Sequence, residues 1–272
     1  MFNRLRRRIG AGLAWYLNRP IKKYFSFSVT PARILRDCLR PGDVLLIEGD
    51  KRISVVIKYF TQSTWSHAAF YVGDALGLKE DGSEPDTLIE ADIKTGVVAV
   101  PLSKYRSVNI RICRPVGLTD ADRELVIQFM VERIGLQYDL KHVFDLLRYL
   151  LPTPPVPVRW RRSMLALGSG EPTRAICSTL IAEAFQSVQY PILPKVRMER
   201  IPGMNGQREL YQMRHSGLFT PRDFDLSPYF QVIKPTLEMG FNYEELEWYE
   251  DPEDPDLAYR PVGKVHSAKS AK

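Results

Sequence analysis

A cysteine, a histidine and a glutamate are the residues of this chain whose types and surroundings best suit covalent chemistry. Cys177 lies where a helix is predicted to begin, shortly after Pro172 and Thr173. Unpaired backbone N–H groups and the helix dipole at such a position favour a thiolate, the form of cysteine that attacks an acyl carbon. Apolar residues continue the same helix face at Ile181 and Phe185, so the thiol faces the domain. A small buried core residue is the alternative interpretation.

His67 and Glu90 are candidates for the base and for the residue that orients it. His67 begins a strand whose other residues are apolar, and Glu90 stands inside the apolar strand run 88–91. Burying a carboxylate without a partner is costly, and an imidazole on the neighbouring strand would be an obvious partner. If the strands pair, Glu90 could hold His67 in the tautomer that accepts a proton from a thiol. The alternatives are a satisfied core histidine and an edge strand that leaves Glu90 in solvent.

The elements that must position these residues predict one α+β domain. Strand-like or short apolar runs fall at 44–47, 65–72, 87–92, 96–102, 108–114 and 230–233, and helical patterns at 53–60, 119–135, 140–150 and 177–188. Short connections between the strands favour an antiparallel meander. Beyond Pro191 the chain is expected to be loop-rich. The domain should span 40–235, between a basic arm at 1–39 and an acidic, mobile tail at 236–272.

The arm has the composition of a basic amphipathic helix. Apolar residues at Phe2, Leu5, Ile9 and Leu13 share a helix face, and ten Lys or Arg stand against one acid in the first forty residues. In residues 1–25 this pattern suits an anionic membrane surface. A helix packed on its own domain with a solvated basic face explains it equally well. An uncleaved signal-like anchor is disfavoured, and no apolar run approaches the roughly 20 residues of a membrane span.

Cysteine usage and charge bound the remaining function classes. Three cysteines in no zinc or disulfide spacing favour a reducing compartment, so we expect a cytoplasmic protein, with the arm allowing peripheral attachment to the inner membrane. Neither a metal nor an organic cofactor is expected. The formal net charge of +6 comes without a basic motif interleaved with base-stacking aromatic residues, so no specific nucleic acid is expected.

Several short stretches also occur in a characteristic order. They are Gly-Asp-Val-Leu at 42–45, Ser-His-Ala-Ala-Phe-Tyr-Val at 66–72, Ile-Glu-Ala at 89–91, Gly-Val at 96–97, Pro-Leu at 101–102, Gly-Leu-Gln-Tyr-Asp at 135–139, Ile-Cys-Ser at 176–178 and Phe-Thr-Pro-Arg-Asp-Phe at 219–224. Together they resemble the signature of permuted papain-fold proteins, in particular the YiiX/YebB-like branch of the NlpC-type cysteine hydrolase superfamily. The resemblance covers residues 40–235.

The resemblance implies a circularly permuted papain-like fold, in which an antiparallel sheet packs against helices and the helix with the nucleophile is C-terminal to the sheet. By position it makes Cys177 the nucleophile, His67 the base and Glu90 the acid of a Cys-His-Glu triad. It also places Tyr138 near the site, where it would position the substrate or an oxyanion. The family often has an acid directly after Cys-Ser, whereas this chain has Thr179.

The implied activity is that of a cysteine hydrolase or acyltransferase acting on an amide, ester or thioester bond. Its substrate would be an acyl-containing small molecule, a lipid or a peptide, and the basic arm with the apolar helix at 140–150 favours a lipid at a membrane surface. Two other classes stay open. A lipid- or fatty-acid-binding protein would keep its ligand after Cys177→Ala, and a nucleic-acid-binding protein would show salt-dependent binding carried by the arm.

Overall fold

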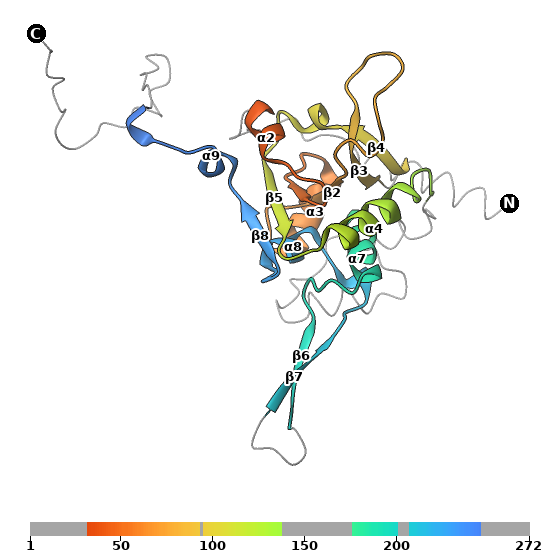
Figure 1. Ribbon diagram of the computed structural model, residues 1–272, viewed down its shortest axis with the longest axis vertical. Helices are drawn as coiled ribbons and strands as arrows, with labels where there is room; N and C mark the ends of the chain where they lie inside the picture. Colours follow the sequence, from red (N-terminus) through yellow and green to blue (C-terminus); the bar gives the residue numbers. More distant parts are fainter. Residues whose placement is uncertain (1–31, 93–94, 138–175, 201–206, 246–272) are drawn as a thin grey trace, which may run out of the picture. The chain divides into compact units, whose positions relative to one another are not determined.

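A six-stranded antiparallel sheet is the centre of the fold, as described by a computed structural model (Figure 1). The structure describes residues 32–92, 95–137, 176–200 and 207–245. Contacts divide the chain into two units, Met1–Met239 and Gly240–Lys272, and the described part of the second contains the short 3₁₀ turn η4 (Tyr243–Glu245). The predicted arm helix within 1–25 and the predicted helix at 140–150 lie outside the described residues. The three-segment division of the chain stays a prediction.

The sheet runs in the order β4-β3-β2-β1-β5-β8. Its strands are β1 (Val44–Ile47), β2 (His67–Tyr71), β3 (Asp86–Asp92), β4 (Gly96–Pro101), β5 (Ile110–Pro115) and β8 (Phe230–Ile233). All neighbours pair antiparallel, and each strand lies within two residues of a predicted run. The prediction of an α+β fold with an antiparallel sheet is confirmed.

The predicted meander is correct from β1 to β4 and wrong for β5. β5 pairs with β1 instead of β4, because Ile112 and Cys113 are buried and need cover on both faces next to the fully buried β1. The chain therefore crosses from β4 to β5 through the 3₁₀ turn η1 (Leu102–Tyr105), whose two end residues are buried. This crossover brings η1 over one face of the sheet.

Helices cover the two faces of the sheet. They are α2 (Ala32–Cys38), α3 (Arg52–Thr61), α4 (Asp120–Val131), α7 (Ile176–Ser187), α8 (Pro221–Leu226) and α9 (Pro235–Glu238), with a 3₁₀ turn η3 (Ser216–Leu218) before α8. α4 begins where the sequence predicts, since the Thr119 side chain accepts a hydrogen bond of 3.1 Å from the Asp122 backbone N–H. α7 contacts α4, β2 and β3, and it follows β5, so that β8 is the one strand of the described residues that joins this sheet after it.

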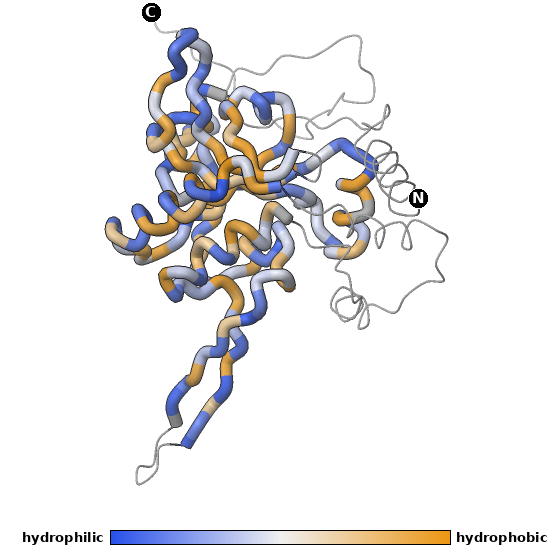
Figure 2. The backbone as a smooth tube through the Cα atoms, turned by 90° about the vertical axis from the view of Figure 1, so that its right-hand side faces the viewer, coloured by the Kyte–Doolittle hydropathy of each residue, from blue (hydrophilic) through white to orange (hydrophobic). Residues whose placement is uncertain are grey.

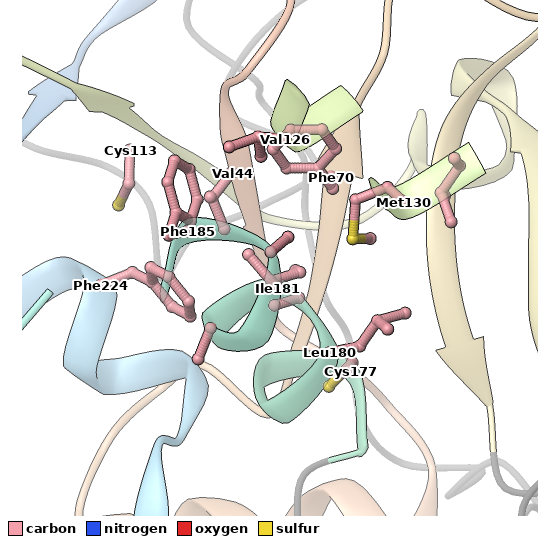
Figure 3. Close-up of a cluster of buried hydrophobic side chains, with 14 of the residues drawn as sticks. Val44, Phe70, Cys113, Val126, Met130, Cys177, Leu180, Ile181, Phe185 and Phe224 are labelled. Atoms are coloured by element: carbon pink, nitrogen blue, oxygen red, sulfur yellow. The ribbon is translucent and has the colours of Figure 1, made fainter. Parts of the chain in front are cut away.

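Residues of β2 and β3 alternate between two apolar clusters, one on each face. Ala68 and Phe70 belong to the cluster that contains α7, whereas Ala69 belongs to the cluster that contains α2 and η1. In the first cluster the Phe185 ring of α7 meets the Phe70 ring edge to face, with ring centroids 6.0 Å apart (Figure 3). α7 is thus fixed to the sheet by apolar contacts.

A second, two-stranded sheet occupies the region where the sequence predicts loops. β6 (Lys195–Arg200) pairs with β7 (Gln207–Gln212) in antiparallel register, and most of its residues are polar (Figure 2). The loop prediction was wrong here, because exposed residues such as Val196 and Met198 give this hairpin no buried apolar run. Cross-strand pairs stabilise it, among them Val196 with Tyr211. Within the described part of the chain, no helix is long and apolar enough to cross a membrane.

Candidate active site

His67 and Glu90 lie on the same face of the sheet. β2 and β3 pair so that Ala69 stands opposite Glu90, which makes Glu90 the diagonal neighbour of His67 on that face. Ala69 between them is small and leaves room for both side chains. The distance between His67 Nε2 and Glu90 Oε2 is 3.1 Å. The structure therefore brings together the two residues that the strand pattern singled out.

Glu90 is buried, with its side chain 2% exposed, and its carboxylate accepts hydrogen bonds from two further groups. The Tyr105 hydroxyl donates to Oε2, the oxygen that also faces His67, and the Lys104 ammonium donates to Oε1. Both donors come from η1. The sequence reasoning missed these two residues. Their signal was the apolar spacing of Leu102 and Tyr105, three residues apart as on one side of a 3₁₀ turn.

Cys177 lies in the first turn of α7, as the sequence predicts, and its side chain is 4% exposed (Figure 3). Its sulfur raises the pKa of His67, so the thiol and the imidazole interact directly. Since Nε2 of His67 faces Glu90, Nδ1 is the ring nitrogen left for the sulfur. Ser178 holds the start of the helix in place, because its buried hydroxyl donates a hydrogen bond of 3.0 Å to the Phe219 carbonyl oxygen.

The position of His67 explains how it reaches both partners. It is the first residue of β2, and its side chain is 23% exposed. α7 packs on the face of Ala68 and Phe70, opposite to the face of Glu90. The contact with Cys177 is therefore made past the end of the strand and not through the middle of the sheet. The His67 ring lies between an acid on one side of the sheet and a thiol on the other.

These neighbours control the protonation of His67. Burial alone would lower the pKa of the imidazole, but Cys177 and Glu90 outweigh burial and raise the pKa from 6.5 to about 10. His67 is thus an imidazolium at neutral pH, with one N–H toward the sulfur and the other toward the carboxylate. This is the state in which a histidine can donate a proton to a leaving group.

The same network keeps Glu90 ionised. Burial would raise the pKa of its carboxyl group, but His67, Lys104 and Tyr105 hold that pKa well below its usual range. Burial, followed by the negative charge of Glu90, raises the pKa of the Tyr105 hydroxyl, so Tyr105 acts as a neutral donor. A carboxylate that is ionised and held on three sides is a rigid acceptor for one histidine N–H.

Cys38 and Cys113 have none of these partners. Burial raises the pKa of both thiols, with the charge of Asp225 adding to the effect at Cys113 and that of Glu238 at Cys38. Cys113 is 0% exposed within β5, and Cys38 at the end of α2 is 8% exposed. All three cysteines are free thiols.

Gly96 and Gly135, two glycines of the short stretches on which the family resemblance rests, allow a close backbone contact near β4. A Cβ atom on Gly96 would lie 2.2 Å from the Leu136 carbonyl oxygen, which accepts a hydrogen bond of 2.9 Å from the Val97 N–H. Gly135, with φ of +90°, donates a hydrogen bond of 2.8 Å back to the Val97 carbonyl oxygen. The start of the Gly-Leu-Gln-Tyr-Asp stretch is thereby fixed to the sheet. Tyr138, predicted to position substrate, lies outside the described residues.

Thr179 stands where the related proteins often carry an acid. Its side chain is 9% exposed, and its hydroxyl has no hydrogen-bond partner among the described residues. It therefore forms no side-chain hydrogen bond with Cys177, His67 or Glu90. Within the described residues, no group of three or more His, Cys, Asp or Glu side chains could hold a metal ion.

Comparison with known protein families places this geometry in context. Residues 38–149 match the family described as permuted papain-like amidase enzymes, YaeF/YiiX, C92 family. The resemblance drawn from the sequence is confirmed. The family is one of amidase enzymes, which supports a general amide hydrolase and confirms the prediction of an enzyme of this class. A comparison with curated proteins found no match.

The matched segment contains only one side of the site. His67, Glu90, Lys104 and Tyr105 lie within it, whereas Cys177 lies beyond its end. The family comparison therefore supports the fold of the segment that carries these four residues. The proposed nucleophile depends on the interaction of Cys177 with His67 and on the position of Cys177 at the start of a helix.

Proposed function

We propose that this chain is a thiol-dependent hydrolase or acyltransferase that acts on an amide, ester or thioester bond. Cys177 is the nucleophile, His67 transfers protons, and Glu90 orients His67. The observation that carries the proposal is the position of the His67 ring, whose Nε2 lies 3.1 Å from Glu90 Oε2 while the Cys177 sulfur acts on the same ring and raises its pKa. A neutral core histidine would need neither a buried carboxylate nor a thiol as partner.

The first half of the reaction makes an acyl-enzyme. In the resting pair His67 already holds the proton of the Cys177 thiol, and the sulfur attacks the acyl carbon to form a C–S bond, which places negative charge on the acyl oxygen. Backbone N–H groups of the first turn of α7 have no partner within the helix and can stabilise this oxyanion. As the bond to the leaving group breaks, the His67 imidazolium gives its proton to the departing nitrogen or oxygen.

The second half releases the acyl group. Neutral His67 removes a proton from water, and the resulting hydroxide attacks the thioester carbon. The C–S bond breaks, the sulfur leaves as a thiolate or takes back the proton from His67, and a carboxylic acid departs. If an alcohol or amine replaces water, the same steps transfer the acyl group. Tyr138 would contribute to substrate or oxyanion positioning according to the resemblance.

Acyl adduct formation tests this proposal without knowledge of the natural substrate. Purified protein is mixed with the activated ester p-nitrophenyl acetate or p-nitrophenyl octanoate, quenched in acid and measured by intact and peptide mass spectrometry. We expect one acyl group on Cys177 and none in Cys177→Ala. In His67→Ala we expect slower acylation, because the thiol is no longer activated, and slower loss of the adduct, because water is no longer activated. Equal acylation of Cys38, Cys113 and Cys177 would contradict the assignment.

We propose that the substrate is a lipid or another acyl-chain compound at a membrane surface. We also propose that the protein is located in the cytoplasm. Support comes from the sequence of residues 1–25, whose basic amphipathic pattern suits anionic lipid. Faster acylation by the octanoyl than by the acetyl ester would favour a long acyl chain. Sedimentation with vesicles of phosphatidylcholine and phosphatidylglycerol checks the surface: full-length protein should bind more than a variant lacking residues 1–25, and equal binding would remove that support.

A further inference from the structure

Glu90 divides its two oxygens between two kinds of partner. Oε2 faces His67 Nε2 at 3.1 Å and accepts from the neutral Tyr105 hydroxyl, whereas Oε1 accepts from the Lys104 ammonium. Two cations, the His67 imidazolium and Lys104, therefore share one buried carboxylate. Because both cations interact with the same negative charge, each one weakens the interaction of Glu90 with the other.

The position of Lys104 is defined by more than one contact. Its ammonium lies 5.4 Å from the centroid of the Tyr105 ring, in addition to its hydrogen bond with Glu90. The backbone of η1 that carries it is anchored by the burial of Leu102 and Tyr105. With its side chain 42% exposed, Lys104 reaches from the solvent side to a carboxylate that is 2% exposed.

We propose that Lys104 is a positioning residue of this site, whose ammonium group shares Glu90 with His67 and thereby limits how tightly Glu90 holds the imidazolium. The inference rests on the proposed role of His67 in proton transfer. A histidine held too tightly by a carboxylate is a poor acid toward a leaving nitrogen, because proton donation becomes less favourable as the donor becomes more basic. Lys104 offsets part of the Glu90 charge without taking the oxygen that faces His67.

The charged and titratable groups around His67 come from three elements. α7 supplies Cys177, β3 supplies Glu90 and Asp92, and η1 supplies Lys104 and Tyr105. Asp92 forms its own ion pair with Lys51, with 3.5 Å between Nζ and Oδ2. Among the described residues, Lys104 and His67 are thus the two cations in direct contact with the Glu90 carboxylate.

Removal of the Lys104 charge should therefore make His67 more basic. A like charge close to a group disfavours the charged form of that group. We therefore expect the loss of the Lys104 charge to raise the pKa of His67 by about one pH unit. Lys51 provides a matched control, since it is 44% exposed and pairs with Asp92, a carboxylate of the same strand as Glu90. The same charge change at Lys51 should be largely screened by solvent.

The test is an NMR titration of His67 in protein labelled at histidine, of which the chain has four. The background is Cys177→Ala, because without the sulfur the His67 titration moves to lower pH, where the fold is easier to maintain. The variants are Lys104→Met, Lys104→Arg and Lys51→Met. His67→Gln assigns the signal. This measurement needs no turnover, so its outcome is independent of whether the proposed hydrolase activity is found.

We expect the His67 midpoint to rise by about one pH unit in Lys104→Met, to return close to the starting value in Lys104→Arg, and to change by less than about 0.3 in Lys51→Met. An unchanged or lowered midpoint in Lys104→Met would overturn the proposal. So would equal shifts in Lys104→Met and Lys51→Met, which would indicate a general effect of net charge. A lower melting temperature with an unmoved titration would assign Lys104 a purely structural role.

Discussion

The two sides of the site are held in place by different forces. On the sheet side, His67 and Glu90 lie on neighbouring strands and are fixed by ladder register and by charged hydrogen bonds from η1. On the helix side, Cys177 is fixed because α7 packs through Phe185 against the sheet. Charge organises the first side and apolar packing the second.

Because different forces hold the two sides, a substitution should be able to disrupt one side and leave the other intact. A change in apolar volume under α7 should displace the thiol while the Glu90–His67 contact persists. A change in charge at Glu90 should alter His67 while α7 keeps its place. The interaction between His67 and Cys177 joins the two sides, so it should be lost in both cases for different reasons.

The largest effect is expected from Phe185→Ala. Phe185 is 0% exposed and contacts Phe70 and Phe230, with centroid distances of 6.0 and 5.2 Å, so truncation leaves a cavity. The free energy of unfolding should fall by about 3–5 kcal/mol, as measured by urea denaturation.

Phe185→Leu serves as the companion variant in case the alanine protein does not fold. In either variant the alkylation of Cys177 by iodoacetamide should slow relative to that of Cys38. Retention of the full Cys177 rate despite a large loss of stability would show that packing at Phe185 does not position the thiol.

Glu90→Gln should have the next largest effect on stability. The amide keeps the shape but removes the charge that Lys104 and His67 contact, and hydrogen bonds to charged groups contribute about 1.5–3 kcal/mol each. We expect a loss of about 2 kcal/mol in denaturant unfolding, together with a lower pKa of His67 in NMR titration. An unchanged His67 titration would separate Glu90 from the control of His67, whatever the stability.

Ser178→Ala tests the polar tether of α7 and should have a smaller effect. The hydroxyl of Ser178 is buried and donates to the Phe219 carbonyl oxygen, so its loss should cost about 1 kcal/mol. Thermal unfolding monitored by circular dichroism measures this. A loss as large as that of Phe185→Ala would mean that the start of the helix is held by this hydrogen bond more than by packing.

The pH dependence of stability should show a gradual slope instead of a step. The folded state keeps the His67 proton up to about pH 10, whereas the unfolded state releases it near pH 6.5, so the stabilising effect of His67 is complete below 6.5 and falls as pH rises toward 10. Glu90 has a lowered pKa in the folded state, so its contribution is complete above its unfolded value of 4.5 and falls in acid.

The contribution of this pair should therefore be greatest between pH 4.5 and 6.5. Urea unfolding across the pH range, compared between the unchanged protein and His67→Gln, measures it. If the difference between the two proteins grew as pH rose from 6.5 to 10, the assigned direction of the His67 shift would be wrong.

On the sheet side, the sequence predicts the pairing of His67 with Glu90 but not the two residues of η1 that contact Glu90. His67 and Glu90 could be paired in advance because alternation within short strands and a short connection leave few other arrangements. Lys104 and Tyr105 could not, since their position depends on β5 crossing back to pair with β1. That choice is made by burial of Ile112 and Cys113 in the whole fold and not by any local pattern.

On the helix side, the residue pattern predicts the helix and the place of Cys177 at its start, whereas the contact with His67 was expected only from the resemblance to permuted papain-fold proteins. That contact depends on how α7 sits on Ala68 and Phe70, which is a packing result from residues about a hundred positions apart. The β6–β7 hairpin escaped prediction for a related reason: cross-strand pairs such as Val196 with Tyr211 stabilise it without a continuous apolar pattern.

The central claim is that Cys177 is an activated nucleophile, and competitive alkylation tests it most directly. Protein is treated with a small amount of iodoacetamide at pH 7, and modification of each cysteine is followed by peptide mass spectrometry. Cys38 is the matched control, because it is 8% exposed against 4% for Cys177, so accessibility alone would favour Cys38. We predict that Cys177 reacts at least about tenfold faster than Cys38 and Cys113, and that His67→Ala removes the advantage. Reaction of Cys177 no faster than that of Cys113 would contradict the account.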